Sequence, residues 1–195
     1  MIRLKWTSQP GKFMTSTPHH QLLPGLPGDG PLPLQFSATG QGQHSEGIVI
    51  RFLPEGMPSW VGNFQPGFCR FNCVLEVEST FHVIVVAGGQ GYIVDVRNGL
   101  LLKHFGGDIE SLISIPELGS TLISNGLWLR LFKGEAEVWC TERLSLDGIR
   151  DIQVSLADGF ITGEGWYLED SWYPFKVCIS SGEATGGAFE SLDAS

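Results

Sequence analysis

The chain is poor in positive charge, with 12 lysines and arginines against 21 aspartates and glutamates in 195 residues, a formal net charge of −9. An acidic surface repels phosphate backbones, so the sequence argues against nucleic acid as a partner. A basic protein partner is compatible with this sign, although an acidic balance also serves simple solubility. Any partner that the chain has is therefore expected to be a basic protein.

Long hydrophobic runs are also lacking. The longest uninterrupted apolar run extends from Val83 to Ala87, far short of the roughly 20 residues that a membrane-spanning helix needs. The segment from Met1 to Trp6 contains Arg3 and Lys5 and has no secretory hydrophobic region. We therefore expect no membrane association and a cytoplasmic chain whose four cysteines are reduced.

No segment shows an apolar stripe at a 3.6-residue period over more than two turns. Instead, β-branched and aromatic runs are interleaved with 26 glycines and 11 prolines, which is typical of strands and tight turns. A short helical turn competes only between Ile109 and Ile113, and Pro116 ends it. The predicted fold class is all-β.

One pattern recurs three times: a β-branched run, a glycine and an aromatic-led second run. If Gly88, Gly126 and Gly163 are equivalent, the copies are 38 and 37 residues apart. The pattern predicts strand–turn–strand units near residues 81–120, 121–158 and 159–195, with these glycines at turns. Such units favour a small propeller-like or twisted sandwich architecture, and a second copy could complete a larger homo-oligomeric assembly.

The first quarter of the chain has a different composition. Six prolines fall within residues 1–46, namely Pro10, Pro18, Pro24, Pro27, Pro31 and Pro33. Because proline removes backbone donors, we predict that residues 1–46 are an arm that adds little to the core of a single β domain at 47–195. One edge strand between Leu32 and Phe36 is still compatible with this composition.

Signals for cofactors and metals are weak. The glycines between Ala87 and Gly91 follow a strand but precede a second strand, whereas a dinucleotide site requires a helix there. Cys69 and Cys73 would lie about 13 Å apart in an extended strand, too far to share one metal ion. We expect no cofactor and no metal.

An enzymatic function is the alternative that the sequence leaves open. No serine lies in a strand-to-helix nucleophile elbow. His82 and His104 flank the first copy of the repeat, where a carboxylate could orient one of them. A hydrolase-like enzyme would need carboxylates that converge in a cleft, and Asp95, Asp108 and Asp147 are the candidates.

Adjacent aromatic pairs mark the last third of the chain, at Trp166-Tyr167 and Trp172-Tyr173. Neighbours on a strand point to opposite faces, so one ring of each pair should face outward. Acidic residues lie among these aromatics, which is typical of a protein-binding surface. The predicted binding residues are Glu164, Trp166, Glu169, Asp170 and Trp172. The sequence thus favours a non-catalytic protein-binding domain, for example an immunity-type acidic neutraliser of a basic partner.

Overall fold

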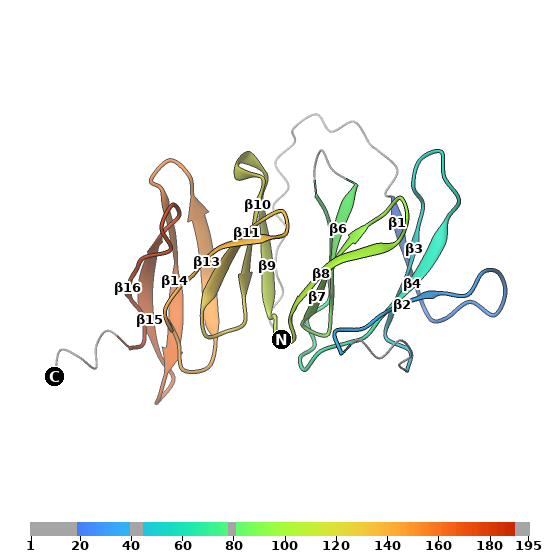
Figure 1. Cartoon of the computed structure of the whole chain (residues 1–195). Coiled ribbons are helices and arrows are strands. Elements are labelled where there is room, and N and C mark those ends of the chain that lie inside the picture. Colours follow the sequence, from blue (N-terminus) through green and yellow to red (C-terminus); the bar gives the residue numbers. More distant parts are fainter. Residues whose placement is uncertain (1–18, 40–44, 78–80, 190–195) are drawn as a thin grey trace, which may run out of the picture.

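The computed structural model describes residues 19–39, 45–77 and 81–189. Within these ranges the chain forms 16 strands, arranged as four four-stranded sheets (Figure 1). The helical content of the described residues is limited to one 3-10 turn, η1 (Pro116–Leu118). The all-β prediction is confirmed.

The first two sheets are formed by the first half of the chain. Sheet A has the strand order β1-β3-β4-β2, with β2 parallel to β4 and the other pairs antiparallel. Sheet B is an antiparallel meander, β5-β6-β7-β8. The strands are β1 (His20–Leu23), β2 (Leu34–Phe36), β3 (Ile48–Phe52), β4 (Trp60–Phe64), β5 (Cys73–Glu76), β6 (His82–Ala87), β7 (Gln90–Asp95) and β8 (Leu100–Gly106).

The second half of the chain forms two further antiparallel meanders. Sheet C contains β9 to β12 and sheet D contains β13 to β16, each in chain order. Their strands are β9 (Ser111–Ile115), β10 (Ser120–Ser124), β11 (Leu129–Lys133), β12 (Ala136–Cys140), β13 (Ile149–Ser155), β14 (Phe160–Tyr167), β15 (Ser171–Cys178) and β16 (Ala184–Gly186).

Each neighbouring pair of sheets shares a hydrophobic cluster, so the sheets stack in the order A, B, C, D. Phe64 meets Tyr92 between sheets A and B, and Ile93 and Phe132 belong to the cluster between sheets B and C. Residues of both sheets, among them Leu131 and Phe175, form the cluster between sheets C and D. Sheets A and D lie at opposite ends of the row (Figure 1), so the described residues form an open stack of four small sheets.

The stacking of the sheets explains how apolar residues are distributed along the strands. In β6, Val83 and Val85 face sheet A, whereas Ile84 and Val86 face sheet C. A strand covered on both faces needs a continuous apolar run rather than alternation. In β14 of the terminal sheet D, by contrast, buried Ile161 is followed by an exposed residue, because one face is left uncovered.

The predicted repeat corresponds to successive sheets of the fold, but one of the three glycines does not lie at the predicted turn. Gly88 lies in the turn between β6 and β7, and Gly126 lies in the turn between β10 and β11, both with positive φ. Gly163 instead lies inside β14, so the prediction that it occupies an equivalent turn is wrong. The matching turn of sheet D is at residues 168–170, where Glu169 and Asp170 have φ of 62° and 56°. The prediction failed because residues other than glycine adopt the left-handed conformation in this turn.

The proline-rich segment contributes to sheet A. β2 lies at one edge of the sheet, as the edge-strand prediction requires, and β1 lies at the other. The expectation that residues 1–46 add little to the core is wrong for Phe36, which is 3% exposed and stacks on Phe64 with ring centroids 4.5 Å apart. The domain boundary between residues 46 and 47 remains a prediction.

No helix in the described part of the chain has the length and apolar character needed to cross a membrane.

Candidate binding surface at one end of sheets C and D

The two adjacent aromatic pairs lie on opposite faces of sheet D. Trp166 of β14 is the direct cross-strand neighbour of Trp172 of β15, and both are half-buried. Tyr167 and Tyr173 point to the other face, where their rings meet edge-on at 6.1 Å. That second face also carries the core shared with sheet C. The tryptophan pair therefore lies on the face of sheet D that no other sheet covers among the described residues.

Arg150 of β13 contacts both Glu164 and Trp172 on the face of sheet D that carries the tryptophan pair. Its Nε and Nη2 lie 2.7 and 2.6 Å from Oε2 of Glu164 on the neighbouring strand. The same guanidinium lies over the ring of Trp172, with Cζ 4.0 Å from the ring centroid. Glu164 is thus already paired with a cation, which weakens its part in the predicted binding set. Arg150, which is not among the predicted binding residues, is the residue that joins Glu164 to Trp172.

Glu169 and Asp170 lie at the tip of the β14–β15 turn. Both are exposed and both have positive φ. No ion pair to either carboxylate forms within the described part of the chain. These two predicted residues therefore present free negative charge beside the tryptophan pair.

A second group of carboxylates lies at the same end of the stack. It consists of Asp108 and Glu110 from the link between β8 and β9, and Asp147 from the link between β12 and β13. Burial, together with the nearby charges of Asp147 and Asp108, raises the pKa of the Glu110 carboxyl. Asn125 Nδ2 donates a hydrogen bond to Asp108 Oδ2 at 2.9 Å. None of the three carboxylates has a cationic partner in the described ranges.

Two glycines connect this acidic group to the tryptophans. A Cβ on Gly126 would lie 2.6 Å from Oε2 of Glu110, so only glycine lets this carboxylate approach the β10–β11 turn. The N–H of Gly148 donates to the carbonyl of Gly126 at 2.9 Å. Gly148 in turn lies against the tryptophan face, since its Cβ position is 3.7 Å from Cη2 of Trp172.

Three loops that are far apart in the sequence thus meet at one acidic and aromatic surface. We call this surface the C–D end, and it comprises Asp108, Glu110, Asp147, Trp166, Glu169, Asp170 and Trp172. Glu110 was not among the residues singled out from the sequence. In the sequence, Glu110 stands out only because it follows the glycine-rich end of a strand. That position does not predict that Glu110 lies near Asp147.

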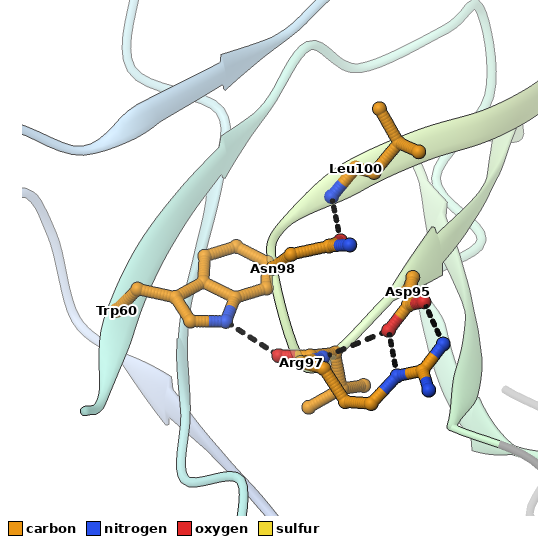
Figure 2. A network of polar contacts seen from close by, with 6 residues as sticks. Trp60, Asp95, Arg97, Asn98 and Leu100 are labelled. Atoms are coloured by element: carbon orange, nitrogen blue, oxygen red, sulfur yellow. Dashed lines mark hydrogen bonds and ion pairs between the residues drawn. The ribbon is translucent and has the colours of Figure 1, made fainter. Parts of the chain in front are cut away.

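The three acids of the enzyme hypothesis do not converge. Asp95 is paired with Leu100 at the start of β8, whereas Asp108 follows the end of that strand. Seven residues of β8 at ~3.3 Å each separate the two ends. Asp95 is also occupied, since Arg97 donates to its Oδ1 from Nε and from the backbone N–H (Figure 2). The Arg97 side-chain hydrogen bond is the largest reason that the pKa of Asp95 is lowered.

The histidines are likewise spread over the molecule. His82 is the cross-strand neighbour of Asp95 in β7, while His104 of β8 is paired with Tyr92. His20 Nδ1 lies 2.8 Å from Oε1 of Glu76, which ties β1 of sheet A to β5 of sheet B. Among the described residues, no three or more His, Cys, Asp or Glu side chains are placed so that they could hold one metal ion.

The fold thus defines an all-β protein of four stacked meander-like sheets with an acidic, aromatic end. No family model and no curated protein sequence matches the chain. One solved structure, described as the crystal structure of the eukaryotic initiation factor, is similar to 72% of this chain at 14% sequence identity and a TM-score of 0.44. The chain spans 39% of the length of that structure's chain.

Proposed function

We propose that this chain is a non-catalytic module that binds a basic protein partner through the C–D end. The observation that carries the proposal is the grouping of Asp108, Glu110 and Asp147, none of which forms an ion pair with a described residue, beside Trp166 and Trp172 on the uncovered face of sheet D. Like charges held together cost free energy in the isolated protein. A partner's lysine or arginine would relieve that repulsion on binding.

The aromatic residues supply the contact area that the carboxylates lack. Trp and Arg are the residue types most enriched among binding hot spots. Trp172 is already stacked with Arg150 at 4.0 Å, which is the geometry a partner's guanidinium would adopt over the neighbouring Trp166 ring. We expect the tryptophans to govern dissociation and the carboxylates Glu169 and Asp170 to govern the rate of association.

The specific role that fits this description is neutralisation of a basic protein, as in an immunity-type inhibitor. The supporting facts are the net charge of −9 and the carboxylates of the C–D end. The four cysteines are free thiols in the structure, which supports a reducing, cytoplasmic compartment as the place of action.

The enzymatic alternative has less support. Glu110 has the raised pKa that a general acid needs. However, the nearest cavity, about 150 Å³ between sheets B and C, is lined by Asp108 but not by Glu110 or Asp147. A substrate held in that cavity would therefore contact only one of the three carboxylates.

The test measures binding of a fluorescently labelled lysine- and arginine-rich peptide at low and at high salt. The triple variant Asp108→Asn, Glu110→Gln and Asp147→Asn should weaken binding at low salt about tenfold, if each charge contributes roughly 0.5 kcal/mol. The matched control neutralises Glu117, Glu135 and Glu183, three exposed glutamates in turns at the opposite end of sheets C and D. Equal losses in both triple variants would show that net charge alone attracts the peptide and would overturn the proposal.

A further inference from the structure

A separate cleft lies between sheets A and B, at the end of sheet B away from Asp108. Its volume is about 260 Å³, larger than the cavity of about 150 Å³ that admits a benzene molecule in other proteins. The cleft is lined by residues of five segments: His19, Pro54, Glu55, Met57, Glu76, Val77, Phe81, His82, Val83, Val96 and Arg97. None of these belongs to the C–D end.

The walls of the cleft are largely apolar. Phe81 and Met57 are 58% and 43% exposed, so two large apolar side chains border the opening. Val83 and Val96 are buried behind them and belong to the core between sheets A and B. Such a cleft can hold an apolar body the size of a phenyl ring, which would remove Phe81 and Met57 from water.

The positive charge in the cleft is already neutralised. Arg97 donates from Nε to Oδ1 of Asp95 at 3.0 Å and from Nη2 to Oδ2 at 2.5 Å (Figure 2). Its Cζ also lies 4.6 Å from the ring centroid of Phe81. This contact shows that the aromatic wall of the cleft accommodates a cation on its face.

Negative charge in the cleft is less fully compensated. Glu76 accepts hydrogen bonds from the backbone N–H of His19 at 3.1 Å and from His20 Nδ1 at 2.8 Å. These histidine contacts outweigh burial and lower the pKa of Glu76, so the carboxyl is ionised at neutral pH. Glu55 forms no ion pair within the described part of the chain.

We propose that this cleft binds an organic cation, an ammonium or guanidinium group carried on an apolar or aromatic body. The apolar body lies against Met57 and Phe81, and the cationic group lies near Glu55 and Glu76. A carboxylate ligand of the same shape is disfavoured, because two glutamates line the opening and Arg97 is committed to Asp95. The same chemistry can come from a free amine or from a lysine or arginine side chain of a protein.

The test is an NMR titration of the full chain, followed through its backbone amides. The probes are 2-phenylethylammonium, the neutral alcohol 2-phenylethanol and the anion 3-phenylpropionate, with a lysine-rich peptide as the macromolecular source of the same cation. We expect the ammonium probe to shift residues of the cleft and to bind more tightly than the other two small molecules. Binding of the peptide but not of the amine would assign the cleft to a protein side chain.

Variants separate the two parts of the site. Phe81→Ala should weaken the ammonium probe about twofold to tenfold, because the phenyl body of the probe loses one aromatic–aromatic contact. Glu55→Gln should weaken it about 1.5-fold to fivefold, while the control Glu117→Gln, on an exposed glutamate of η1, leaves it unchanged.

Equal binding of the ammonium and the anion, or shifts by the ammonium probe that lie outside the cleft, would overturn the proposal. Because the cleft shares no residue with the C–D end, this result is independent of the proposed function. Loss of peptide binding in the Asp108, Glu110 and Asp147 variant tests the C–D end alone.

Discussion

Trp60 of sheet A donates its indole N–H to the backbone carbonyl of Val96 in sheet B at 2.7 Å (Figure 2). The same relationship recurs between sheets C and D, where Trp139 donates to the carbonyl of Ile179 at 2.8 Å. In both cases the acceptor lies just after the third strand of its sheet. Between sheets B and C, Lys103 Nζ takes the place of the indole and donates to the carbonyl of Glu135 at 2.5 Å. Side-chain donors thus tie every pair of neighbouring sheets at the same point of the repeat.

These contacts predict a stability loss that is specific to the indole N–H. Trp60→Phe and Trp139→Phe each remove the donor and leave a carbonyl without its partner, which should cost ~1–2 kcal/mol of unfolding free energy. The measurement is urea unfolding followed by circular dichroism. Trp128→Phe is the matched control, since its indole N–H makes no hydrogen bond to the described residues. A comparable loss in the control would mean that ring volume, not the hydrogen bond, matters.

Glu110 gives a pH-dependent prediction. Burial and the charges of Asp147 and Asp108 raise its pKa in the folded chain, so the folded state binds this proton more tightly than the unfolded state. The contribution of Glu110 to the free energy of unfolding therefore falls as pH rises from the unfolded-state pKa of this carboxyl through its higher folded-state pKa. Glu110→Gln should stabilise the protein at neutral pH by roughly 0.2–1 kcal/mol, the range of solvent-screened charge interactions. The gain should vanish below the unfolded-state pKa, and a gain that persists at low pH would contradict the electrostatic account.

Cys178 should be the most reactive of the four thiols. A hydrogen bond from Ser180, and further ones from Ser181, lower its pKa to about 7. Burial instead raises the pKa of Cys73 and of Cys140. Alkylation by iodoacetamide, mapped by mass spectrometry, should therefore reach half its maximal rate near pH 7 at Cys178. Ser180→Ala should move this midpoint upward, and an unchanged midpoint would show that the serine hydroxyl does not act on the thiolate.

The N-terminal strand gives a prediction about folding. β1 pairs with β3 from His20 to Leu23, and His20 bonds Glu76 of sheet B. Deleting residues 1–30 should leave a folded chain but lower the Tm by about 5 °C or more, since each 1 kcal/mol is worth ~2–4 °C at this size. His20→Ala, which removes only the contact with Glu76, should have a smaller effect. A truncated chain with an unchanged Tm would restore the view that this strand is dispensable.

Local sequence patterns predicted the elements better than they predicted the site. The continuous apolar run of β6 and the alternation of Trp166 with Tyr167 follow directly from strand geometry. The approach of Glu110 to Asp147 depends on the packing of two loops from different sheets, which no local pattern records. Arg150 pairs with Glu164 on the neighbouring strand, but its stacking on Trp172 depends on the registers of three strands, which no local pattern records.

The most direct test of the proposed binding function is a map of where a basic peptide contacts the chain. In an NMR titration at low salt, the lysine- and arginine-rich peptide should perturb the amides of Asp108 to Glu110, the amide of Gly148 and the indole signals of Trp166 and Trp172. The perturbations should shrink as salt screens the charges. Perturbations centred on the turns that hold Glu117, Glu135 and Glu183, or spread evenly over all four sheets, would contradict the account.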